Sequence, residues 1–183
     1  MARESIGRAE YFACAMTLLE EDGFTGLTAV SLCNRLGVTR GSFYHHFTSF
    51  EDFVDHFLTY WEETYSVELI ERSTSADLGA QVRMQTGFAI GLRHNAEAAL
   101  RAWAAVNPKV AEAQERVDSL RRTGLSESLQ THGDTREAAD LYATIAITTL
   151  VGMQMTNRPV DPAYLEKIYA RLALALLHDE IKT

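Results

Sequence analysis

The stretch TGLTAVSLCNRLGVTRGSFYHHFTSFEDF, residues 25–53, carries the strongest fold signal of the chain. It reads as two short helices joined by a tight turn and followed by the start of a third helix. Thr28 and Thr39 each precede a helical segment, and threonine hydroxyls cap the free backbone N–H groups of a helix start. Gly37 lies between the segments, where a sharp turn needs a permissive backbone. The pattern predicts a helix-turn-helix.

The second of these helices, residues 40–46, would lie in the major groove of DNA, with its first residues against base edges and its later ones against phosphate. Phe43 and Phe47 are spaced to point inward. Tyr44 falls on the opposite side, where contact with a thymine methyl group or a phosphate would explain an exposed aromatic ring. In the first helix, Val30, Leu32 and Leu36 are expected to bury the inner face.

These residues resemble the N-terminal pattern of the TetR family of one-component transcriptional regulators. The residues that match in register are Thr28, Leu32, Cys33, Leu36, Gly37, Val38, Thr39, Gly41, Phe43, Tyr44, His46, Phe47, Ser49 and Glu51. The resemblance implies a DNA-binding domain at residues 1–48 and a ligand-binding and dimerisation domain at residues 49–183. It also implies that the chain acts as a regulator without a cofactor.

Phe50 departs from the family pattern, which usually has a lysine close to a phosphate at this position. Each phosphate contact changes the slope of log binding constant against log salt concentration by about one unit. We therefore expect weaker or less salt-sensitive DNA binding than in a typical member. Packing against the recognition helix is another use for the Phe50 ring.

The candidate DNA contacts lie in and beside the two helices. They are Thr28, Thr39, Arg40, Gly41, Ser42, Tyr44, His45 and His46. Arginine is the residue that most often bonds guanine bidentately, so Arg40 is a candidate for a base or a nearby phosphate contact. Gly41 costs a helix up to about 1 kcal/mol relative to alanine, which is consistent with close backbone approach to DNA. Adjacent histidines point about 100° apart on a helix, so a metal site at His45 and His46 is not expected.

Charge is the main argument against DNA binding. The chain has 183 residues and a net charge of −8, and residues 1–60 contain four basic and eight acidic residues. DNA binding needs a basic surface rather than a basic domain, and Arg3, Arg8 and Arg40 fall on the N-terminal arm and the recognition helix. The alternative reading is a helical small-molecule-binding protein whose headpiece no longer binds DNA.

Composition and motifs exclude several other classes. Hydrophobic residues make up 46% of the chain, yet no apolar run approaches the roughly 18 residues of a membrane span. The N-terminus lacks a secretion signal, so a cytoplasmic location is expected. Cys14 and Cys33 fit a role as small core residues better than a redox switch. The sequence contains no nucleophile with a nearby base, no paired carboxylates, no metal cluster and no phosphate loop. An enzyme is therefore not expected.

Apolar spacing predicts an all-α fold of about nine helices, with the helix-turn-helix headpiece followed by a helical bundle. Gly23 is expected to end a helix that starts near residue 5. Asp134 with Glu137, and Asp161 before Pro162, are predicted helix starts. The remaining expected helices span about residues 49–71, 77–94, 96–106, 108–130, 136–156 and 162–178.

The last two predicted helices are apolar over more than half of their circumference, so they must be covered on two sides. A homodimer through these helices meets that need, and a central position in a monomer is the alternative. Candidate ligand contacts inside the bundle are Trp61, Tyr65, Met84, Phe88, Trp103 and Met153, with Arg83, Arg93 or Arg101 facing an anionic group; a plain core or surface role is the alternative for each. Together with the resemblance, this predicts a ligand-responsive repressor, or an activator of the same fold, that binds a palindromic double-stranded DNA operator as a homodimer.

Overall fold

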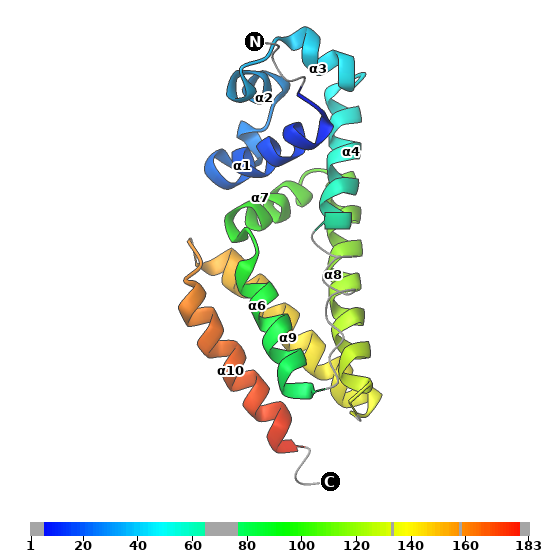
Figure 1. Ribbon diagram of the computed structural model, residues 1–183, viewed down its shortest axis with the longest axis vertical. Helices are drawn as coiled ribbons and strands as arrows, with labels where there is room; N and C mark the ends of the chain where they lie inside the picture. The colour runs from blue at the N-terminus through cyan, green and yellow to red at the C-terminus, as the bar shows by residue number, and fades with distance from the viewer. Residues whose placement is uncertain (1–5, 65–76, 133, 158, 180–183) are drawn as a thin grey trace. The chain divides into compact units, whose positions relative to one another are not determined.

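The computed structural model describes residues 6–64, 77–132, 134–157 and 159–179. In these parts of the chain there are nine α-helices and no β-strand, so the all-α prediction is confirmed (Figure 1). None of the described helices combines the length and the hydropathy needed to cross a bilayer. The predicted helix over residues 49–71 is described only to residue 64, so Tyr65 lies outside the described residues.

Contacts between residues divide the chain into two compact units. Unit 1 comprises residues 1–61 and 93–114, and unit 2 comprises residues 62–92 and 115–183. The helix-turn-helix residues therefore pack in one unit with a segment far along the chain. The division into functional domains at residue 48 remains a prediction, because compact packing does not itself define function.

Unit 1 contains the headpiece helices and two later segments. The helices are α1 (Arg8–Gly26), α2 (Ala29–Leu36), α3 (Arg40–His46), α4 (Phe50–Glu62) as far as Trp61, α7 (His94–Ala104) and the first residues of α8 (Pro108–Gln130). Aromatic rings dominate its core, where Tyr11, Phe43, Phe53 and Phe57 have no exposed surface. Gly23 interrupts α1 at the position where a helix stop was predicted. Its backbone is not helical (φ 70°, ψ −174°), and a second short run of helix follows as far as Gly26.

The predicted turn between α2 and α3 is confirmed in detail. The Thr28 hydroxyl accepts a hydrogen bond from the Ser31 N–H (3.1 Å), and the Thr39 hydroxyl accepts one from the Ser42 N–H (3.2 Å). Gly37 adopts the left-handed conformation at φ 65° and ψ 32°, which a side chain would disfavour. The two helices are therefore capped and joined as their residue types require.

Val30 lies on the outer face of α2, contrary to its predicted inward position. It is 41% exposed, whereas Leu32 and Cys33 are buried. Residues that are two positions apart in an α-helix point about 200° apart around the helix axis, so Val30 and Leu32 cannot share a face. Cys14 and Cys33 are both buried, and burial raises the pKa of each thiol, in line with a core role.

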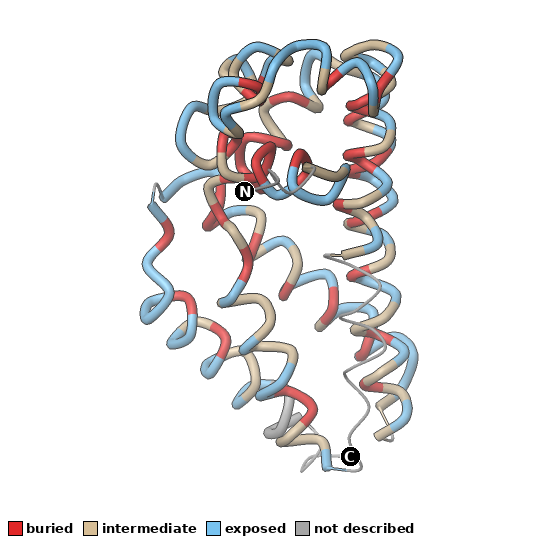
Figure 2. The backbone as a smooth tube through the Cα atoms, turned by 45° about the horizontal axis from the view of Figure 1, so that its top comes forward, coloured by how far each residue is buried: buried red, intermediate tan, exposed pale blue. Residues whose placement is uncertain are grey.

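Unit 2 contains α6 (Leu78–Gly91), most of α8, α9 (Arg136–Thr156) and α10 (Pro162–Asp179). α10 packs on α6 and α9, and buried residues recur on the inner side of these helices (Figure 2). The carboxylate of Asp161 caps α10 by accepting from the Ala163 N–H at 2.9 Å, as predicted. α9 is capped by the Thr135 hydroxyl rather than by Asp134, because Thr135 is the residue whose side chain reaches the Ala138 N–H.

Candidate nucleic-acid interface and ligand cavity

Two phenylalanines fix the recognition helix α3 to the core of unit 1. Phe43 and Phe47 are 0% and 1% exposed. Both rings meet Tyr11 of α1 edge to face, at centroid distances of 5.7 and 5.6 Å. Such aromatic packing has preferred geometry, so it sets the rotation of α3 about its own axis. The opposite side of α3 is thereby held facing solvent.

Arg40, Tyr44 and His45 occupy this outer side, and all three are exposed. Tyr44 is 55% exposed, and its ring stands edge to face against Phe43 at 5.3 Å. Within the described residues, neither the Arg40 guanidinium nor the Tyr44 hydroxyl has a hydrogen bond or ion pair. The guanidinium and the hydroxyl group therefore lie on one exposed face of α3, and neither is needed for a hydrogen bond within the fold.

The remaining candidate DNA contacts are engaged in holding the headpiece. Besides capping α2, the Thr28 hydroxyl lies 2.8 Å from that of Ser31. The Ser42 hydroxyl accepts a hydrogen bond from Tyr11 Oη (3.3 Å), so it faces inward. The His46 ring packs beside Tyr11 at 5.7 Å. These side chains therefore help to hold α2 and α3 in place.

Gly41 is exposed on α3, and folding does not require a glycine there. A Cβ atom at this position would meet only the Thr39 hydroxyl at 3.6 Å, an ordinary van der Waals contact. The fold itself therefore leaves room for a side chain at this position.

Arg8 binds the C-terminal end of α3, a role that the sequence analysis missed. Its guanidinium donates to the His46 carbonyl at 2.8 Å and lies over the Phe47 ring at 5.3 Å. A cation at a helix C-terminus also interacts favourably with the helix dipole. No signal in the sequence could have found this contact, because it joins residues 38 positions apart. Arg3 lies outside the described residues.

Three acidic residues of the headpiece form ion pairs with basic side chains. Arg35 donates to Glu21 at 2.7 Å, Arg93 donates through Nε to Glu20 at 2.9 Å, and Lys109 donates to Asp55 at 2.6 Å. Arg93 and Lys109 come from outside residues 1–60, so the count of charges in that segment omitted them. The charge argument against DNA binding is correspondingly weaker.

Phe50 contacts its own helix. Its ring stacks on Phe53 at 5.7 Å, one turn along α4. No ring contact between Phe50 and α3 is present in the described residues. Phe53 in turn meets Phe43 and Phe47, so Phe50 extends the aromatic core.

Residues 12–57 match the family model of the bacterial regulatory proteins, tetR family. They form a tetR-family headpiece. The matched range includes α2, α3 and nearly all of α1, together with the first part of α4. The resemblance noted in the sequence is thereby confirmed.

Solved structures share the fold of the chain well beyond this tetR-family headpiece. A transcriptional regulator from Rhodococcus sp. Rha1 is 20% identical, with 95% of this chain and 97% of that chain covered and a TM-score of 0.78. A TetR transcriptional regulator from Legionella pneumophila is 17% identical, with 96% and 99% covered and a TM-score of 0.79. A transcriptional regulator from Saccharomonospora viridis in complex with choline is 17% identical, with 90% and 93% covered and a TM-score of 0.68. No curated protein gave a significant match.

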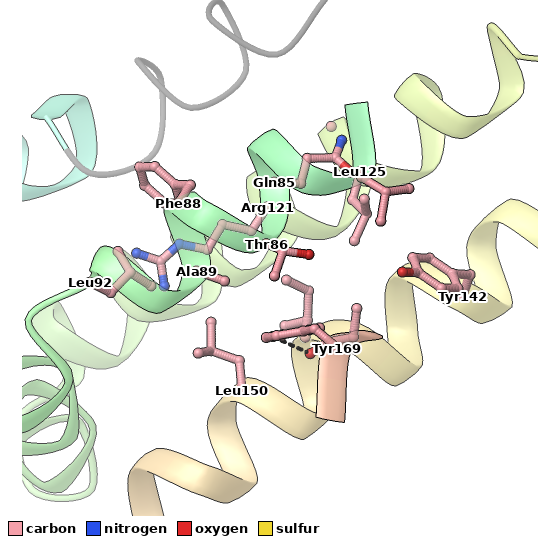
Figure 3. Close-up of a pocket in the computed structure, with 14 residues that line it drawn as sticks. Gln85, Thr86, Phe88, Ala89, Leu92, Arg121, Leu125, Tyr142, Leu150 and Tyr169 are labelled. Atoms are coloured by element: carbon pink, nitrogen blue, oxygen red, sulfur yellow. Dashed lines mark hydrogen bonds between the residues drawn. The ribbon is translucent and has the colours of Figure 1, made fainter. Parts of the chain in front are cut away.

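Unit 2 contains a cavity between α6, α8, α9 and α10 (Figure 3). Its empty space is about 650 Å³, open solvent at the mouth included. The lining is mostly aliphatic and aromatic, with polar groups from Gln85, Thr86, Arg121, Tyr142 and Tyr169. A largely apolar cavity with a few polar groups is typical of a small-molecule site.

The structure places the predicted ligand contacts in different parts of the molecule. Phe88 lines the cavity, and Met153 belongs to the apolar core beside it without lining it. Met84 is 41% exposed. Trp61 and Trp103 belong to unit 1, where Trp61 donates to Glu97 at 3.2 Å and Trp103 stacks on Phe24. Tyr65 lies outside the described residues, and ligand contact by these residues remains a prediction.

The sequence analysis missed the charged residue of the cavity. The predicted partners for an anion, Arg83 and Arg93, make ion pairs with Asp77 and Glu20. Arg121 lines the cavity instead and is 2% exposed. Its spacing of four residues from both Val117 and Leu125 was the available signal, because it places Arg121 on the apolar side of α8. The described residues contain no cluster of histidine, cysteine or acidic side chains suited to a metal ion.

Proposed function

We propose that the chain is a homodimeric, ligand-responsive repressor that binds a palindromic DNA operator and acts by binding rather than catalysis. The observation that carries this proposal is the outer face of α3 in a tetR-family headpiece. There the Arg40 guanidinium and the Tyr44 hydroxyl are exposed and make no hydrogen bond or ion pair within the described residues, while Phe43 and Phe47 fix the inner face. A rigid helix with uncommitted polar side chains suits readout of the major groove.

Arg40 is the proposed base contact, through bidentate bonds to guanine. Tyr44 would meet a thymine methyl group or a phosphate, and His45 lies beside it on the same face. Gly41 would allow the helix backbone to come close to DNA. Thr28, Thr39, Ser42 and His46 would act mainly by holding the two helices, with phosphate contacts at the helix starts.

Exposed apolar residues on α9 and α10 support the proposed dimer. Leu141, Ile145 and Met155 of α9 are 61%, 41% and 45% exposed, and Tyr164 and Leu174 of α10 are 56% and 49% exposed. The residues of each helix recur at helical spacing, as a buried helix face requires. A second copy would cover the same surface on both subunits, which is the usual geometry of a two-fold dimer.

The cavity in unit 2 supports a small-molecule effector. The Saccharomonospora viridis protein of the same fold was solved with choline, so a small ligand is compatible with this architecture. Its effect on DNA binding would follow from different affinities for two conformations of the repressor. A cytoplasmic location belongs to the same proposal, since the repressor must reach its operator DNA.

A mobility-shift titration tests the proposal. The purified chain is added to labelled DNA from upstream of its own gene, with increasing salt and excess unrelated competitor DNA. A complex that resists competitor and weakens with salt is expected. Absence of a specific complex on this DNA, and on sequences selected from a random pool, would contradict it and favour a headpiece that no longer binds DNA.

A further inference from the structure

Three of the five polar side chains that line the cavity in unit 2, among the described residues, already have partners in the chain. The Gln85 amide donates to the Ser128 hydroxyl at 3.0 Å, which joins α6 to α8. The Tyr169 hydroxyl donates to the Ala146 carbonyl at 3.0 Å, which joins α10 to α9. Arg121 also has an interaction partner of its own. These three side chains therefore help to build the wall of the cavity.

The other two polar side chains are Thr86 of α6 and Tyr142 of α9. Both are half-buried, and they point toward one another across the cavity (Figure 3). Neither hydroxyl makes a hydrogen bond within the described residues. Burial raises the pKa of Tyr142, so its hydroxyl keeps its proton and can donate. A hydroxyl group withdrawn from water is unfavourable until it forms a hydrogen bond, so a ligand atom that reaches both groups would be held firmly.

Apolar side chains form much of the remaining wall. Phe88, Leu92 and Leu150 lie around the same space as the two hydroxyls (Figure 3). Each methylene group that a ligand buries against such a surface tightens binding about fourfold. A small polar molecule would leave this part of the wall unused, so the ligand needs an apolar body as well as a polar atom.

We propose that the cavity binds an apolar carbonyl compound, such as a ketone or an ester, whose oxygen accepts hydrogen bonds from the Thr86 and Tyr142 hydroxyls. A carbonyl oxygen has two lone pairs, so it can accept both bonds and has no proton of its own that needs an acceptor. The body of the ligand lies against Phe88, Leu92 and Leu150. The inference rests on the proposed function in one respect, namely that this ligand is the effector.

Calorimetric titration of the full chain with probes of one shape tests the ligand class. The probes are propiophenone, its alcohol 1-phenyl-1-propanol, and propylbenzene, which has no oxygen. The ketone is expected to bind more tightly than the alcohol, because the alcohol O–H needs a further acceptor once both hydroxyls donate. Butyrophenone, with one more methylene group, should bind about fourfold more tightly than propiophenone.

Three variants of the wall show which hydroxyls the ketone uses. Tyr142→Phe and Thr86→Val each remove one hydroxyl and keep the shape of the side chain. Each should weaken propiophenone binding about three- to tenfold, the value of one hydrogen bond, and change propylbenzene binding by less than about twofold. Tyr169→Phe is the matched control and should leave the ratio of the two affinities unchanged, because the Tyr169 hydroxyl is bonded to Ala146.

Tyr142→Phe and Thr86→Val remove no hydrogen bond of the fold within the described residues, so both should keep the circular dichroism spectrum of the wild type. If one of them does not fold, the other still decides the question. The proposal is overturned if neither ketone binds, or if the alcohol binds more tightly than the ketone. It is also overturned if the folded variants bind propiophenone as the wild type does, or lose propylbenzene to the same extent.

The same samples separate this inference from the proposed function. Binding of the ketones through the two hydroxyls, without a specific DNA complex, would support the ligand class and contradict the proposed repressor. A specific DNA complex without binding of either ketone would support a regulator and overturn the ligand class. Release of the operator by propiophenone from the wild type, with a higher concentration needed for Tyr142→Phe, is the result expected if both hold.

Discussion

The spacing of residues along α3 is enough to predict which of its aromatic side chains are buried and which is exposed. Phe43 and Phe47 lie on one side and are buried, as predicted, and Tyr44 lies on the other and is exposed. Ser42 is the residue for which spacing was insufficient. Its hydroxyl meets Tyr11 of α1, and a contact 31 residues away has no signature in local sequence.

Replacement of Arg40 by alanine should cost about 1–3 kcal/mol of binding free energy at the specific operator, with little change in thermal stability. The reason is that Arg40 makes no contact that the fold requires within the described residues. Fluorescence anisotropy with specific and unrelated DNA measures both affinities. Arg35→Ala is the control, since Arg35 is committed to Glu21 at 2.7 Å. Equal specific affinity for Arg40→Ala and wild type would remove Arg40 from base readout.

Asp52 should make folding stability depend on pH in the acid range. The Thr48 N–H donates to its carboxylate at 2.7 Å, and this bond is the main cause that lowers the pKa of Asp52. A carboxyl group with a lowered folded pKa stabilises the fold above its unfolded pKa, and this contribution is lost as pH falls through the folded pKa.

The difference in unfolding free energy between wild type and Asp52→Asn should therefore shrink on acidification. Denaturant unfolding over a series of acid pH values measures it. Glu51→Gln is the matched control, because Glu51 has no hydrogen bond or ion pair in the described residues. A difference for Asp52→Asn that does not vary with pH would contradict the assignment.

At the scale of helices, caps and breaks were the most predictable features. Thr28, Thr39 and Asp161 cap helices as expected, because their hydrogen bonds are local. The break predicted at Gly23 is confirmed, because its non-helical φ and ψ interrupt α1, and a second short run of helix follows as far as Gly26. The cap of α9 was predicted one residue early, because Asp134 and Thr135 are both good capping residues and only geometry chooses between them.

Gly41→Ala should separate folding from DNA binding. The new methyl group has room, so the helix should gain up to about 1 kcal/mol of stability relative to glycine. Specific DNA binding should weaken, because the methyl group stands where the backbone approaches DNA. Thermal unfolding and anisotropy measure the two effects. Gly87→Ala, at an open position in α6, should stabilise without changing DNA binding, and unchanged binding by Gly41→Ala would exclude close approach there.

At the scale of the whole molecule, contacts between distant segments could not be predicted. The cavity needs residues from α6, α8, α9 and α10, and its charged residue lies in a helix whose sequence is mostly polar. The aromatic residues chosen from sequence for the ligand site were selected by type, and Trp61 and Trp103 pack in unit 1. The type of a residue indicates whether it is buried, but only the tertiary structure shows which buried residues line the same cavity.

Ile145→Asp should dissociate the proposed dimer. Ile145 is 41% exposed in a helical apolar stripe, and each subunit of a two-fold dimer would bury an unpaired carboxylate there. Sedimentation velocity should show a monomer with an unchanged circular dichroism spectrum. Ser119→Asp, at an exposed position of α8, is the control for added charge. A dimer that survives Ile145→Asp and Leu141→Asp together would place the interface elsewhere.

Footprinting of the operator by the wild-type chain tests the central claim most directly, because it reports specificity, symmetry and spacing together. The account predicts two protected half-sites related by a dyad, with centres about 34 Å apart on one face of the duplex. Protection should be lost with Arg40→Ala at concentrations where the wild type is bound. Uniform protection without a preferred site, or a single half-site, would contradict a dimeric regulator that reads DNA through α3.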